Sequence, residues 1–97
     1  MLSSLGNVVY LQERYEQAVG YHQEAIAIAQ RLKDIPAEIK ALYNVGVNLL
    51  ALERKAKTIE IWRQGLRLAK QQNLSALEEV LSSSILEVGS EQDLGQS

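Results

Sequence analysis

The side chains that could do acid–base or nucleophilic chemistry are few and scattered. The sequence has one histidine, His22, and no cysteine, which excludes thiolate nucleophiles, disulfides and zinc thiolate sites. Its two aspartates, Asp34 and Asp93, lie far apart, and adjacent Glu78 and Glu79 would point to different faces of a helix. Paired catalytic carboxylates, metal-ligand spacings and phosphate loops are therefore missing. We expect no enzymatic activity, no cofactor and no metal site, and a packing role for His22.

An internal repeat is the strongest pattern in the chain. Two stretches with an offset of forty residues share identical positions: Leu2 and Leu42, Gly6 and Gly46, Glu13 and Glu53, Arg14 and Arg54, Ala29 and Ala69. Repeats of this length are typical of stacked helical hairpins. Such stacks present long surfaces to partners, so the repeat favours a binding function.

Apolar residues spaced three and four apart predict five helices. The first two run over about residues 2–12 and 15–32, with a turn at Glu13 and Arg14. Asp34 as a cap and Pro36 in the first turn begin a third helix, which ends near residue 52. The fourth covers about 55–71, with Asn73 as its C-terminal stop.

The fifth predicted helix covers residues 75–88 and caps the stack, because its outer positions are polar. We expect one domain over residues 1–89, with repeat one at 1–33 and repeat two at 34–73. Residues 90–97 are polar and are expected to form a disordered tail.

Both units resemble tetratricopeptide repeats, over residues 1–73. The positions that carry the resemblance are Leu5-Gly6, Ala18 and Ala25 in repeat one, and Val45-Gly46, Trp62 and Gly65 in repeat two. The period of forty resembles the subclass seen in kinesin light chains and bacterial signalling proteins. The resemblance implies an all-α right-handed superhelix of two hairpins plus the capping helix, and a protein-binding scaffold. Gly46 and Gly65 would allow close helix approach, and Trp62 would fill the wider gap.

The resemblance also implies a groove along the first helix of each hairpin, where asparagines hold an extended peptide. Asn7 and Asn44 match such positions, and asparagine both donates and accepts hydrogen bonds. The candidate groove residues are Asn7, Tyr10, Lys40, Tyr43, Asn44 and Val47. Ser3 stands where the family's carboxylate-clamp lysine would be, so a hydrophobic or mixed peptide is expected. Alternatively, each asparagine is an ordinary solvated or capping residue.

A second hypothesis is homo-oligomeric assembly through the first helix. Leu2, Leu5 and Val8 would form an open apolar edge with nothing before it, and exposed apolar patches mark interaction sites. In that case the groove asparagines would be incidental.

The charge distribution argues against nucleic acid as a partner. Residues 37–73 hold seven basic and three acidic residues, whereas residues 74–97 hold five acidic and no basic ones. Arg63, Arg67 and Lys70 could form a positive stripe. The aromatic residues are expected in the core or groove, which leaves no platform for base stacking; they are Tyr10, Tyr15, Tyr21, Tyr43 and Trp62. No run approaches about 18 apolar residues, so no membrane span is expected, and the cysteine-free composition fits a cytoplasmic protein.

Overall fold

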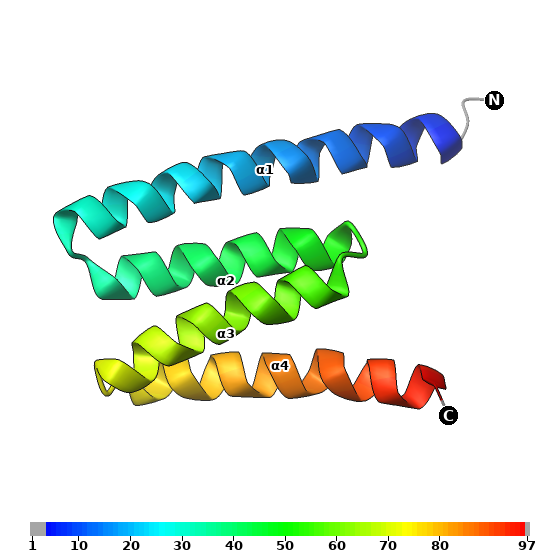
Figure 1. Ribbon diagram of the computed structural model, residues 1–97. Helices are drawn as coiled ribbons and strands as arrows, with labels where there is room; N and C mark the ends of the chain where they lie inside the picture. The colour runs from blue at the N-terminus through cyan, green and yellow to red at the C-terminus, as the bar shows by residue number, and fades with distance from the viewer. Residues whose placement is uncertain (1–3, 97) are drawn as a thin grey trace.

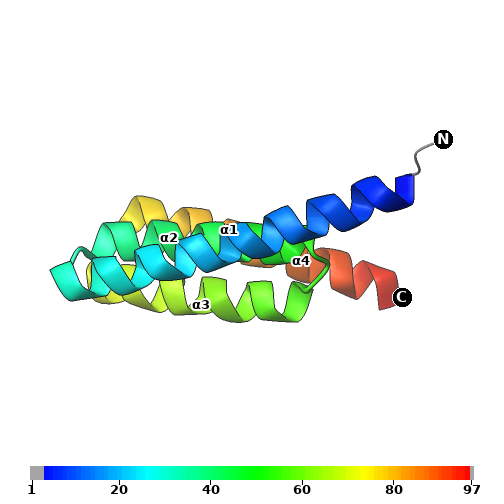
Figure 2. The same ribbon diagram turned by 90° about the horizontal axis from the view of Figure 1, so that it is seen from above.

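The computed structural model describes the backbone of residues 4–96 and the side chains of residues 11–89. It contains the helices α1 (Ser4–Leu32), α2 (Ile35–Ala51), α3 (Lys55–Gln71) and α4 (Ser75–Gln96). Consecutive helices run antiparallel (Figure 1). Seen from above, α3 and the first half of α4 lie on opposite sides of α2 (Figure 2). The described backbone has no strand, so the all-α helical class is confirmed.

The prediction of five helices was wrong, because the first two predicted helices form one continuous helix. Glu13 and Arg14 lie inside α1 rather than in a turn. The segment around them, residues 11–14, consists of Leu, Gln, Glu and Arg. All four have high helix propensity, and the segment contains no glycine or proline that would interrupt the helix.

The same Glu-Arg pair does form a turn forty residues later, where tertiary hydrogen bonds hold the hairpin. The Thr58 hydroxyl donates to the Gly46 carbonyl at 3.0 Å. The Trp62 indole N–H donates to the Tyr43 carbonyl, also at 3.0 Å. Both bonds cross from α3 to α2, so they fix the two helices of this hairpin against each other.

Repeat one has different residues at these two donor positions. Ala18 stands where repeat two has Thr58, and His22 stands where it has Trp62. Ala18 has no hydroxyl to donate, and an imidazole is smaller than an indole. We attribute the continuous α1 to this difference. Without the hydrogen bonds that hold the turn in repeat two, the high helix propensity of residues 11–14 keeps this segment helical.

Three turns of the same geometry connect the four helices. Lys33, Glu53 and Asn73 have φ angles of 58°, 63° and 57°, which places them in the left-handed region. In each turn the following N–H bonds to a carbonyl five residues earlier: Asp34 to Ala29, Arg54 to Leu49, and Leu74 to Ala69, each at 2.9 Å. This is the bonding of a helix C-terminal cap, and it confirms Asn73 as a stop.

The beginning of α2 also matches its prediction. Asp34 precedes the helix and its Oδ1 accepts a hydrogen bond from the Ala37 N–H at 3.2 Å, while Pro36 lies in the first turn. The helix α4 begins at Ser75 as predicted but continues to Gln96, past the expected end at residue 88. Gly89 alone does not end a helix, because an isolated glycine costs only about 1 kcal/mol. The division into repeat units stays a prediction.

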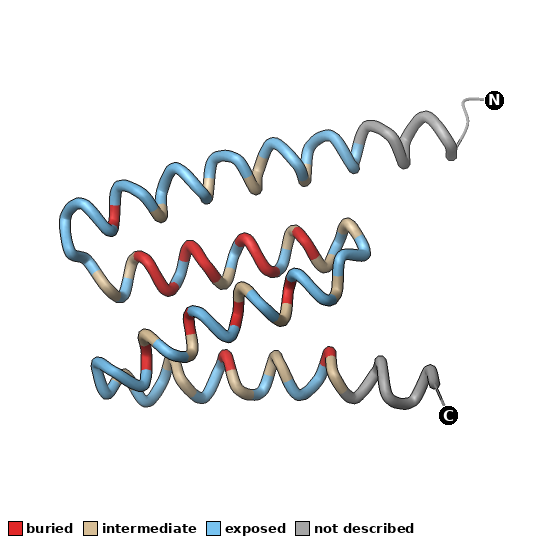
Figure 3. The backbone as a smooth tube through the Cα atoms, viewed as in Figure 1, coloured by how far each residue is buried: buried red, intermediate tan, exposed pale blue. Residues whose placement is uncertain are grey.

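A buried apolar cluster of Ile39, Trp62, Ala69, Leu81 and Val88 lies between α2, α3 and α4. Ala29 of α1 is also buried. Buried positions on α2 and α3 face one another, whereas most of the described part of α1 is exposed (Figure 3). A Cβ built at Gly46 would overlap the Trp62 ring, and one at Gly65 would lie 3.3 Å from Leu81 Cδ1. Each glycine therefore makes room for a side chain of a neighbouring helix, and an approach of the helix backbones at these positions stays a prediction. None of the described helices has an apolar stretch sufficient to cross a bilayer.

Candidate functional site

A groove of about 250 Å³ lies between α2 and α4. It is lined by Ile39, Lys40, Tyr43, Asn44, Leu77, Val80 and Leu81. Three of the residues expected from the sequence, Lys40, Tyr43 and Asn44, are therefore neighbours on one surface. Ile39 and Leu81 are almost fully buried and form an apolar floor below them.

Tyr43 is held in place at the side of the groove. Its ring stacks on Trp62 with a centroid distance of 5.4 Å and an interplanar angle of 13°. Its carbonyl accepts the Trp62 indole N–H. The groove wall at Tyr43 is thus continuous with the core, which limits the rotamers open to this side chain.

Asn44 and Lys40 supply polar groups at the rim. Both side chains are exposed. The Asn44 carbonyl accepts a hydrogen bond from Asn48 Nδ2 at 2.8 Å, but among residues 11–89 its side-chain amide bonds to no protein group. That amide can therefore pair with the N–H and C=O of another chain, and the Lys40 ammonium can add donors one turn away.

The other sequence-predicted site residues lie elsewhere. Val47 is 42% exposed and does not line this groove. The side chains of Asn7 and Tyr10, and those of the predicted oligomer edge Leu2, Leu5 and Val8, lie outside the described residues.

The helix α4 contributes Leu77 and Val80 to the groove. The resemblance had placed Val80 at a groove position of the family, whereas Leu77 was expected only in the capping helix. The forty-residue offset aligns Val80 with Lys40, which indicates that Val80 occupies an equivalent position on the groove surface. A capping helix occupies the place of the next repeat's first helix, so it also provides a groove wall.

A second, larger cleft of about 490 Å³ lies between α1, α2 and α3. Its most unusual group is Glu38, which is only 8% exposed and whose Oε2 accepts a hydrogen bond from Gln30 Nε2 at 3.1 Å. The remaining lining combines amides, aliphatic side chains and one guanidinium: Gln23, Ile26, Leu42, Val45, Ile61, Gln64, Arg67, Leu68 and Gln71. His22 is not among these lining residues.

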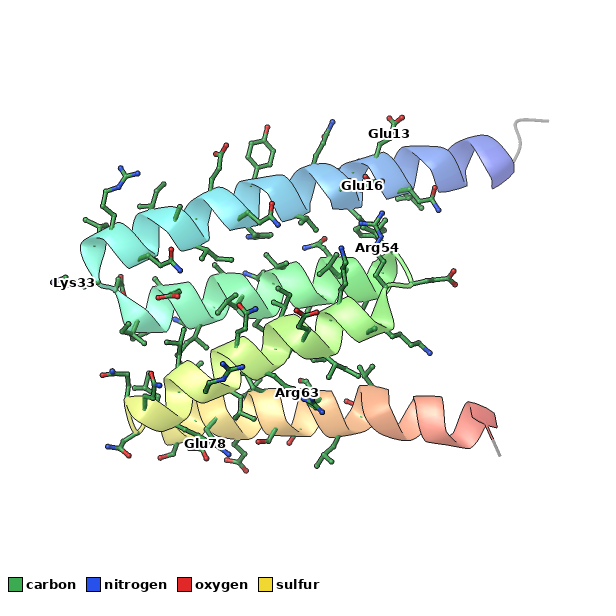
Figure 4. The ribbon with its side chains drawn as sticks, viewed as in Figure 1. Glu13, Glu16, Lys33, Arg54, Arg63 and Glu78 are labelled. Atoms are coloured by element: carbon green, nitrogen blue, oxygen red, sulfur yellow. The ribbon has the colours of Figure 1, made fainter. Side chains whose placement is uncertain are left out.

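Most of the other described charged side chains are exposed. Glu13 projects from the side of α1 opposite α2 (Figure 4). Arg63, Arg67 and Lys70 are all exposed on α3. Within the described part of the chain, no group of three or more His, Cys, Asp or Glu side chains could hold a metal ion.

The comparison with protein families agrees with this architecture. A family model described as tetratricopeptide repeat matches residues 1–71. No curated protein and no solved structure was found to match the chain. The matched region covers most of the sequence and includes α2, α3 and the turn between them. The chain therefore belongs to the tetratricopeptide repeat family, whose members are protein-interaction scaffolds.

Proposed function

We propose that this protein binds an extended peptide segment of a partner protein in the groove between α2 and α4. The observation that carries the proposal is the convergence of Lys40, Tyr43 and Asn44 with apolar Leu77 and Val80 on one surface. A peptide backbone needs a group that donates and accepts, which Asn44 supplies. Its side chains need an apolar floor, which Ile39 and Leu81 supply.

The residues that line the groove also indicate which kind of peptide would fit it. Most of the groove is apolar, and Lys40 is its one charged lining residue among those described. A peptide with apolar side chains and a single acidic residue near Lys40 matches this lining best, because an unbalanced buried charge would cost free energy. The resemblance implies a basic residue at the position of Val80 in members of the family that clamp a carboxylate, so this groove is not suited to an acidic C-terminus.

The proposal also covers the repeat subclass and the cellular location of the protein. The left-handed residues Lys33, Glu53 and Asn73 are spaced by twenty, which supports a place among the repeats with a forty-residue period. Catalysis and nucleic-acid binding form no part of the proposed function. The cytoplasmic location stays a prediction from composition.

The test is a selection of peptides from a random displayed library against the full chain, followed by affinity measurements. We expect Asn44→Ala to weaken the selected peptides at least about fivefold, which corresponds to one lost hydrogen bond. Val80→Glu should weaken them further, because Val80 is 48% exposed and the new charge would lie in the apolar part. Gln64→Ala is the matched control, since Gln64 is an amide that lines the other cleft. Unchanged affinity for Asn44→Ala and Val80→Glu would overturn the groove assignment.

A further inference from the structure

A second apolar stripe runs along α1, on a side that no other described helix covers. Its members, which we call the α1 stripe, are Tyr21, Ala25, Ile28 and Leu32. Tyr21 is 72% exposed, Ile28 52% and Leu32 71%, and Ala25 is also exposed. Tyr21 was expected in the core or the groove, and that expectation was wrong. Spacings of four, three and four residues are the pattern by which helices pair with one another.

The forty-residue repeat allows the α1 stripe to be compared with the corresponding positions of α3. Ala25 corresponds to Gly65 of α3, which is buried and whose added Cβ would lie 3.3 Å from Leu81 and 3.8 Å from Ile39. Tyr21 and Ile28 correspond to Ile61 and Leu68, which are half-buried and line the cleft toward α1. In α3 the positions that match Ala25 and Ile28 pack against neighbouring helices, and the position that matches Tyr21 lines the cleft. In α1 the same positions are open.

We propose that the α1 stripe of a second copy of this chain covers the α1 stripe, so that the two helices pair antiparallel about a twofold axis. In this register Tyr21 packs on the partner's Leu32, and Ala25 packs on the partner's Ile28. The twofold axis repeats both contacts. The outer pairs each join two large side chains, Tyr21 and Leu32. The inner pairs each join the small Ala25 with Ile28, which permits close packing of the two helices.

Charge complementarity selects this partner and this register. Glu24 and Arg31 are exposed on the solvent edge of the stripe, and within residues 11–89 neither forms an ion pair. The antiparallel register sets Glu24 against the partner's Arg31 and, by symmetry, Arg31 against the partner's Glu24. A parallel pair would instead set Glu24 against the partner's Ala29, which carries no charge. Edge charges of this kind set orientation and partner choice in paired helices.

The first test is the mass of the full chain in solution by sedimentation equilibrium from about 5 µM to about 500 µM, since small interfaces bind weakly. We expect a reversible dimer. Leu32→Glu should weaken dimerisation at least about tenfold, because it places a charge in each outer layer. Leu86→Glu is the matched control: Leu86 is 69% exposed on α4 and should leave the dimer unchanged. Circular dichroism should show the same helix content for both variants.

The second test uses the charges. Glu24→Arg alone and Arg31→Glu alone should each weaken the dimer, because each brings like charges together twice. An equimolar mixture of the two variants should dimerise again, because every cross-pair is then of opposite sign.

A chain that is monomeric over the whole range would overturn the proposal. A dimer weakened by Leu86→Glu, or a mixture that fails to recover, would overturn it as well. A monomeric chain, or a mixture that fails to recover, would overturn the dimer and leave the peptide proposal standing, because α1 does not line the groove between α2 and α4.

Discussion

Trp62 and Tyr43 are joined twice, once through their rings and once through a hydrogen bond. The rings stack at 5.4 Å, and the Trp62 indole N–H donates to the Tyr43 carbonyl at 3.0 Å. Trp62 is 3% exposed, whereas Tyr43 lines the groove. The pair therefore connects the core of the second hairpin to the candidate binding surface.

Trp62→Phe removes the indole N–H but keeps an aromatic ring against Tyr43. We expect a loss of about 2 kcal/mol in the free energy of unfolding, from the hydrogen bond and the smaller ring together. Urea denaturation followed by circular dichroism measures it. Tyr21→Phe is the control, because Tyr21 is 72% exposed and loss of its hydroxyl should change stability little. Equal stability of the two variants would contradict the structural role of the Trp62 bond.

Gly46→Ala and Gly20→Ala should have opposite effects on stability. A Cβ at Gly46 would overlap the Trp62 ring, so this variant should lose at least about 2 kcal/mol through overpacking. A Cβ at Gly20 meets nothing within 4 Å, so alanine there should gain about 0.5–1 kcal/mol from helix propensity. Thermal unfolding of both variants and of the parent chain measures these changes in stability. A change in the same direction for both variants would contradict the close packing at Gly46.

Glu53→Gly should stabilise the protein. Glu53 has a φ of 63°, a conformation that costs free energy for residues with a Cβ and none for glycine. We expect a gain of up to about 1 kcal/mol by chemical denaturation. Glu60→Gly serves as the control, since Glu60 is exposed within α3 and glycine there should cost about 1 kcal/mol. A loss of stability for Glu53→Gly would argue against the left-handed turn.

Thr58→Val tests the bonds that close the second hairpin. Thr58 is fully buried, and its hydroxyl lies 3.0 Å from the Gly46 carbonyl and 3.1 Å from the Arg54 carbonyl. Valine keeps the shape and removes the donor, so we expect a loss of about 1 kcal/mol in the free energy of unfolding. Ser83→Ala removes an exposed hydroxyl from α4 and should be nearly neutral; a neutral Thr58→Val would show that these bonds do not hold the turn.

Local signals in the sequence were enough for the start of α2, the end of α3 and the turn that follows α3. Asp34, Pro36 and Asn73 act within a few residues of their own positions, through a cap, a fixed φ and a left-handed conformation. The tight packing at Gly46 and Gly65 was expected from the resemblance to tetratricopeptide repeats. The same resemblance named Lys40, Tyr43 and Asn44, which line one groove, and their role in binding stays a prediction.

The sequence by itself determined an all-α chain with a forty-residue repeat, since periodicity and caps are local properties. Only the tertiary structure decided that Glu13 stays helical while Glu53 turns. Each is followed by an arginine, Arg14 or Arg54, but the turn at Glu53 is held by bonds from Thr58 and Trp62 that reach back 12 and 19 residues. The exposure of Tyr21 and the place of Leu77 in the groove were decided in the same way, because burial depends on which helices lie alongside and not on local spacing alone.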